Sequence, residues 1–218
     1  MASLAVWLVR LSATPARRTA WTWRAALVVG LWLAGHAALA ASGLLSLETV
    51  PPPALAYLAI TLGLGAWVAA SAVGKRLATL PMAALVGLMA FRVPLELILH
   101  ALYDAGLVPV QMTWSGLNFD VVTGLSAALL ALFLWRRPVS DAVVTAWNVA
   151  GSALLVTVVA IAVLSAPLPI RQFHEGPPLV LVFHAPYNWI VNVHVLTALV
   201  GHLVIFRKLA WQRRDGRT

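Results

Sequence analysis

Long uncharged and apolar stretches dominate the chain, and short groups of charged residues separate them. Four of these stretches are residues 25–47, 49–74, 142–170 and 176–206. Each is longer than the roughly 20 residues that an α-helix needs to cross the hydrocarbon core of a bilayer. A soluble domain has no use for four such stretches, so the pattern predicts an all-α protein that crosses a membrane several times.

Six membrane-spanning helices follow when the stretches are divided at charged groups and prolines. We expect them near residues 25–46, 54–74, 79–103, 117–135, 142–165 and 187–206. The connections are mostly short, which predicts antiparallel neighbours and a compact bundle of six transmembrane helices. The chain is then one integral membrane domain over 1–218. Residues 1–23 would be a cytoplasmic N-terminal segment, with 1–11 lying as an interfacial helix on the inner leaflet, and 207–218 a basic cytoplasmic tail.

The basic residues indicate which side of the membrane each end occupies. Thirteen of the 15 Lys and Arg residues lie at the two termini or in alternate loops: Arg10, Arg17, Arg18, Arg24, Lys75, Arg76, Arg136, Arg137, Arg207, Lys208, Arg213, Arg214 and Arg217. The positive-inside rule produces this pattern when both termini are cytoplasmic, an N-in and C-in topology with an even number of helices. It also predicts contact with anionic lipids at the cytoplasmic face.

Composition agrees with this picture and excludes several classes of function. The chain is 61% hydrophobic and 10% charged, with a mean hydropathy of +0.90. Its net charge of +8 could suggest nucleic acid, but the basic residues follow the topology, so we expect no nucleic-acid partner. The chain has no cysteine, which rules out disulfides and thiolate chemistry. A multi-pass protein of a bacterial inner (plasma) membrane is the expected localisation.

Ionisable side chains inside predicted spans are the candidates for chemistry, because a bilayer makes them costly. The third predicted helix carries Arg92, Glu96 and His100 at four-residue intervals, a stripe that drifts by only about 40° per step. The fourth has fifteen uncharged residues over 121–135, roughly 22 Å, so Asn118 and Asp120 must enter the membrane with it. We expect a network of Arg92 with Glu96 and Asp120 in the outer half of the bundle.

One arginine cannot neutralise two ionised carboxylates, which is the charge argument for a site. A shared proton, a bound cation or a protonated His100 would supply the missing positive charge. In the alternative interpretation, these charges are an ion-paired lock that fixes the register of the helices.

Polar residues of the sixth predicted helix extend the proposed outer pocket. They are Tyr187, Asn188, Asn192 and His194. Hydrogen bonding that holds the helices together is the alternative role of the two amides. Asn148 and His202 form a second, smaller polar layer in this interpretation, placed near the inner side.

The histidines allow a metal site but define none. His100 and His184 are the candidate ligands for a metal ion at the outer rim, where Glu96 or Asp120 could add oxygen atoms. A haem held by two histidines is disfavoured, since only His36 and His194 fall at matched depths. The cofactor therefore stays unknown at this stage.

Three functions remain open, and whether the protein is an enzyme is not decided by the sequence. In the first, the outer pocket binds a small polar ligand or metal ion for chemistry within the membrane. Glu96 or Asp120 would accept a proton, Arg92 would hold an anionic group, and His100 would relay a proton. The second is a small proton-coupled transporter, which requires the outer pocket to connect with the inner layer. The third is a non-catalytic accessory subunit whose polar stripe meets a partner membrane protein.

The predicted topology can be tested with a reporter fused after Thr218. We expect a cytoplasmic reporter to be active there and a periplasmic reporter to be inactive. A fusion in the predicted outer connection at Gly176 is the matched control and should give the opposite result. A periplasmic C-terminus would contradict the even number of helices.

Overall fold

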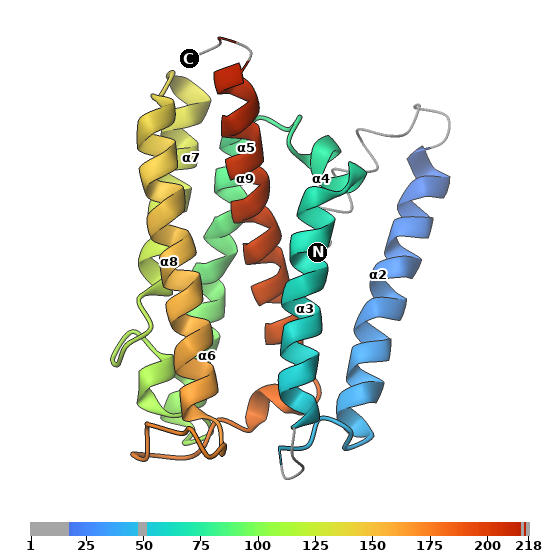
Figure 1. Cartoon of the computed structure of the whole chain (residues 1–218), viewed down its shortest axis with the longest axis vertical. Coiled ribbons are helices and arrows are strands. Elements are labelled where there is room, and N and C mark those ends of the chain that lie inside the picture. The colour runs from blue at the N-terminus through green and yellow to red at the C-terminus, as the bar shows by residue number, and fades with distance from the viewer. Residues whose placement is uncertain (1–17, 48–51, 215, 217–218) are drawn as a thin grey trace. The chain divides into compact units, whose positions relative to one another are not determined.

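The computed structural model describes residues 18–47, 52–214 and 216. Within these ranges the regular elements are all helices and no β-strand occurs, which confirms the all-α class for this part of the chain. In chain order they are α2 (Arg18–Ala41), α3 (Pro53–Ala70), α4 (Ala72–Leu77), α5 (Met82–Leu88), η2 (Met89–Phe91), α6 (Arg92–Asp104), η3 (Val110–Met112), α7 (Asp120–Arg136), α8 (Asp141–Ser165), η4 (Leu181–Phe183), η5 (Ile190–Val195) and α9 (Leu196–Arg214) (Figure 1). The short element η5 is a π-helix, and the other η elements are 3₁₀-helices.

Five helical segments of the described chain are long and apolar enough to cross a membrane. They are Thr19–Ala41, Pro53–Ala70, Met82–Asp104, Asp141–Ser165 and Ile190–Arg214. They correspond to five of the six predicted spans and favour a multi-pass membrane protein. The remaining one, α7, has 17 residues, or about 26 Å, slightly less than the ~30 Å of a bilayer core. A sixth span therefore stays a prediction.

Both ends of the described chain are more helical than the sequence pattern indicated. The first long helix begins at Arg18, whereas the prediction began it at Ala25. The last one continues to Arg214, so much of the predicted basic tail over 207–218 belongs to α9. Charged and polar residues extend these helices beyond their apolar parts, because Arg and Lys are good helix formers. The interfacial helix predicted for 1–11 lies outside the described residues.

The third predicted helix starts a few residues later than expected and contains a 3₁₀ turn. Residues 78–81 are turns and bends, and the helical segment starts at Met82 after Pro81. A 3₁₀ turn over Met89–Phe91 then leads into α6. Pro94 falls in the first turn of α6, where a missing N–H costs nothing. Arg92 is thus ten residues from the start of this helical segment, or ~15 Å along its axis.

The chain divides into two compact units, and each is described by itself. Unit 1 comprises residues 1–79 and 182–197, and unit 2 comprises 80–181 and 198–218. Unit 1 therefore contains α2, α3, α4 and the π-helix, while unit 2 contains α5 to α8 and all but the first two residues of α9. The predicted single membrane domain over 1–218 stays a prediction.

Within unit 2, α7 packs against α5 and α6, and a glycine permits the closest approach. A Cβ atom at Gly124 would lie 2.8 Å from Cγ2 and 2.9 Å from the backbone nitrogen of Val93. The backbone of α7 therefore rests directly on the first turn of α6. Asp120, one turn before Gly124, consequently comes next to Arg92, the first residue of α6.

Replacing Gly124 by alanine should destabilise the protein by about 1–3 kcal/mol, since the new methyl group would meet the side chain and the backbone nitrogen of Val93 at under 3 Å. Gly63→Ala is the matched control, because a Cβ there meets nothing within 4 Å. That control should be neutral or stabilising by up to ~1 kcal/mol. Equilibrium unfolding in mixed micelles measures both values, and equal stabilities would contradict the proposed close contact.

Candidate functional site

A buried ion pair joins the starts of α6 and α7 in unit 2. Arg92 donates from Nη1 to Oδ1 of Asp120, and the two residues are only 1% and 5% exposed. Asp120 is also well placed electrostatically, because a carboxylate in the first turn of a helix faces the positive end of the helix dipole. Since an unpaired charge is costly away from water, each residue depends on the other to be buried here.

Arg92 has a second partner, His202 of α9, which lies 110 positions away in the sequence. Its Nη2 is 3.0 Å from Nε2 of His202. A guanidinium only donates, so Nε2 must accept and the proton of the imidazole must be on Nδ1. Nδ1 is 2.7 Å from Oδ1 of Asn148, which accepts that proton, while Nδ2 of Asn148 donates to the backbone oxygen of His202 at 3.1 Å. The hydrogen-bond network therefore assigns a neutral imidazole with one tautomer.

Gly151 of α8 makes room for this imidazole. A Cβ at Gly151 would lie 2.8 Å from Cε1 of His202. The helix backbone therefore covers one edge of the ring, and His202 and Asn148 are 1% and 0% exposed.

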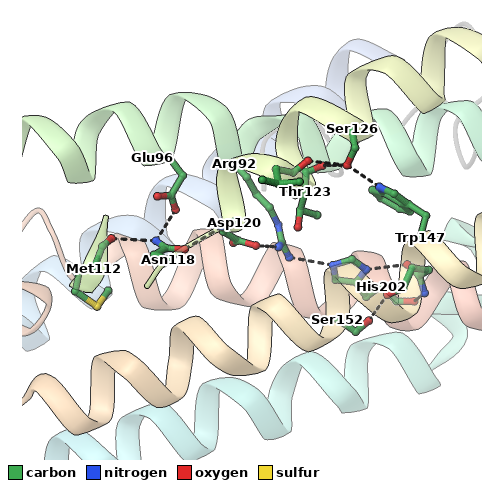
Figure 2. A network of polar contacts seen from close by, with 12 residues as sticks. Arg92, Glu96, Met112, Asn118, Asp120, Thr123, Ser126, Trp147, Ser152 and His202 are labelled. Atoms are coloured by element: carbon green, nitrogen blue, oxygen red, sulfur yellow. Dashed lines mark hydrogen bonds and ion pairs between the residues drawn. The ribbon is translucent and has the colours of Figure 1, made fainter. Parts of the chain in front are cut away.

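Glu96 joins the ion pair through the side chain of Asn118. Nδ2 of Asn118 donates to Oε1 of Glu96 at 2.8 Å and to the backbone oxygen of Met112 at 3.0 Å. Its Oδ1 accepts from the backbone N–H of Asp120 at 3.1 Å, which satisfies a free donor at the start of α7. Figure 2 shows the result, a chain of polar contacts from Met112 and Asn118 through Asp120 and Arg92 to His202.

Several polar atoms in this cluster are buried with no hydrogen-bond partner in the described part of the chain. They are Nε of Arg92, Oε2 of Glu96 and, one turn further along α6, Nδ1 of His100. An unsatisfied buried group costs about 1–3 kcal/mol. The charge count points the same way, because two ionised carboxylates and one arginine sum to −1. A bound proton would balance the charge, and a water or small polar ligand would satisfy these donors and acceptors.

The structure thus brings four of the predicted site residues together, namely Arg92, Glu96, Asn118 and Asp120. It corrects the expectation that Asn148 and His202 form a separate inner layer, because His202 bonds Arg92 directly. No local sequence signal identified His202 as a partner of Arg92.

The predicted site residues of the last span belong to unit 1 and have partners there. Asn188 donates to the backbone oxygen of His36 at 2.7 Å, and Asn192 donates to the hydroxyl of Tyr57 at 2.6 Å. Nδ1 of His194 lies 3.3 Å from the backbone oxygen of Trp189. Tyr187 is half-buried, and its backbone oxygen accepts from Ile190. Sequence analysis did not single out Tyr57, and it gave His36 no partner.

The two candidate metal ligands have different surroundings. The ring of His100 stacks on Trp114, with ring centroids 4.1 Å apart and planes at 12°. His184 is exposed and lies in unit 1, whereas His100 lies in unit 2. Among residues 18–47, 52–214 and 216, no group of three or more His, Cys, Asp or Glu side chains is arranged to hold a metal ion. The metal hypothesis gains no support from this geometry.

Comparisons with protein-family models, with curated proteins and with solved structures find no match for this chain. The functional argument therefore depends on the geometry of the buried cluster.

Replacing Asp120 by asparagine should lower the free energy of unfolding by about 3–5 kcal/mol, because the buried guanidinium of Arg92 then loses the carboxylate to which it is directly bonded. The double replacement of Arg92→Met with Asp120→Leu should recover most of this loss. Arg213→Met is the control, since Arg213 is exposed and donates to the hydroxyl of Thr145 in α8, and it should change stability by less than about 1 kcal/mol. Additive effects of the single replacements Arg92→Met and Asp120→Leu in a double-mutant cycle would contradict the ion pair.

Proposed function

We propose that this chain is a proton-coupled carrier and that the cluster around Arg92 in unit 2 is its coupling site. One observation carries the proposal. Arg92 bonds Asp120 and His202 at the same time, and so joins the outer carboxylates to Asn148 through a continuous line of buried polar groups. Chains of acidic and histidine side chains within a membrane are typical of proton relays in transporters. Because a carrier must connect its two polar layers, this continuity favours transport over a site restricted to one face.

The carboxylate of Asp120 and an anionic substrate would compete for Arg92, and this competition couples proton binding to substrate binding. A proton bound by Asp120 removes the counter-ion of Arg92, whose buried charge then requires another anionic partner. A small anion that meets this need would enter together with the proton, and the pair adds no net charge to the site. When the anion leaves, Asp120 releases its proton and forms the ion pair with Arg92 again. Glu96, held by Asn118, is the group on the outer side of this exchange.

A binding site without transport is the second candidate, and the unpartnered atoms favour it. Oε2 of Glu96 and Nε of Arg92 offer one acceptor and one donor to a small polar ligand, with His100 one turn away on α6. The two candidates differ in what they require of His202, which only the carrier needs. Burial argues against the accessory-subunit hypothesis, because Arg92 and Glu96 are each 1% exposed and are not free to meet a partner helix.

The setting that we propose for this activity is a bacterial inner membrane, with both chain termini in the cytoplasm. The five long apolar helices support a multi-pass arrangement, and α7 would complete six spans if its polar start, Asn118 to Asp120, is counted with it. The alternation of basic groups along the sequence supports the orientation.

Proton coupling can be measured in proteoliposomes that enclose a pH-sensitive dye. An inward gradient of each member of a panel of small organic and inorganic anions is imposed, and acidification of the interior is followed. We expect at least one anion to drive proton entry, and we expect Asp120→Asn and His202→Phe to reduce the rate at least about tenfold. Gln172→Ala, on an exposed side chain of unit 2, is the control and should match the wild type.

The same experiment separates the two candidates. If His202→Phe leaves the proton flux intact while Asp120→Asn removes it, the inner half of the cluster is not used and the one-sided site is favoured. If no anion moves protons faster than in empty liposomes, the carrier hypothesis is wrong.

A further inference from the structure

A second polar cluster lies in unit 1, and the proposed transport activity does not use it. It consists of Tyr57 from α3 and of Asn188 and Asn192, which flank the start of the π-helix Ile190–Val195. Both asparagines are 0% exposed and Tyr57 is 7% exposed. A π-helix is rare, and such elements are frequently found at functional sites.

The hydrogen bonds of this cluster fix the direction of both amide groups. Nδ2 of Asn188 donates to the backbone oxygen of His36 at 2.7 Å. Nδ2 of Asn192 donates to the hydroxyl of Tyr57 at 2.6 Å and to the backbone oxygen of Asn188 at 3.0 Å. Rotating either amide by half a turn would place its oxygen against a carbonyl oxygen, so the assignment of nitrogen and oxygen is not ambiguous.

The amide oxygens of Asn188 and Asn192 consequently accept none of these hydrogen bonds. Oδ1 of Asn188 and Oδ1 of Asn192 are buried and have no hydrogen-bond partner among the described residues. The amide nitrogens of Asn188 and Asn192 already make the contacts that hold the helices together. The two amide oxygens take no part in those contacts. The hydroxyl of Tyr57, which accepts from Asn192, has one proton of its own and can donate to only one of these two oxygens. At least one buried acceptor therefore needs a further positive or proton-bearing species.

The types of oxygen ligand in the cluster indicate which kind of cation it would bind. The described residues of unit 1, over 18–47, 52–79 and 182–197, include no Asp or Glu. Calcium and magnesium are bound largely through carboxylates, whereas neutral carbonyl oxygens can replace the hydration shell of a monovalent cation. In transporters, interrupted helices supply such oxygens for monovalent cations.

We propose that Tyr57, Asn188 and Asn192 form a binding site for a dehydrated monovalent alkali cation. The position of the cluster along its helices suits this role. Tyr57 is four residues from the start of α3 and Asn192 is two residues from the start of the π-helix, or about 6 Å and 3 Å along the axes. An ion would therefore reach the site from one membrane face without crossing the apolar interior.

Equilibrium binding of radioactive sodium, and separately of radioactive rubidium as a potassium analogue, tests the proposal. The full chain is purified in a choline buffer, and bound ion is measured against an excess of the unlabelled ion. We expect saturable binding of at least one of the two ions. Asn192→Leu should weaken it at least about tenfold, and Tyr57→Phe, which removes one oxygen and keeps the ring, should weaken it several-fold. Thr61→Val is the matched control, because Thr61 is buried one turn along α3 and its hydroxyl is already bonded to the backbone oxygen of Tyr57.

Absence of saturable binding of either ion to the wild type would overturn the proposal, as would unchanged affinity in a folded Asn192→Leu variant. Should Asn192→Leu fail to fold, as judged by its elution profile in size-exclusion chromatography, unchanged affinity in Tyr57→Phe would overturn it. The result is independent of proton coupling, because Asp120→Asn alters unit 2 and should leave cation binding intact.

Discussion

The need to bury the charge of Arg92 governs the architecture of unit 2. An arginine at 1% exposure is stable only if its charge is paired and its donors are used. Asp120 supplies the charge, and Gly124 lets α7 come close enough for the pair to form. His202 takes a second donor and is itself fixed by Asn148. Four helices, α6 to α9, thus meet through one guanidinium.

Most of this site could be predicted by comparing the length of each apolar stretch with the thickness of a bilayer. An apolar stretch over 121–135 that is too short to cross a bilayer forces Asn118 and Asp120 inward, and the cost of burying them favours pairing with Arg92. The same argument predicted the helices, because twenty apolar residues have few other uses. These inferences need only the spacing of residues along the chain and the energy of a charge in an apolar medium.

Partners that depend on packing between distant segments could not be predicted in this way. His202 is 110 positions from Arg92, and no spacing within either helix relates the two residues. The π-helix at Ile190–Val195 follows from no simple periodicity, so the pairing of Asn192 with Tyr57 was also missed. In both cases the contact joins segments that are far apart in the sequence, and the hydrophobic pattern says nothing about which of their side chains meet.

The two clusters raise the same question, whether buried polar groups serve only to lock helices together. A lock is most stable when each donor and acceptor is satisfied, since every unmet group subtracts from the stability that the lock provides. Among the described residues, Nε of Arg92 and Oε2 of Glu96 have no partner in the first cluster, and the amide oxygens of Asn188 and Asn192 have none in the second. The former atoms belong to ionisable groups and the latter are neutral oxygens. A purely structural role accounts for the bonds that form but not for these remaining atoms, whereas binding of a proton with an anion in one unit, and of an alkali cation in the other, accounts for both.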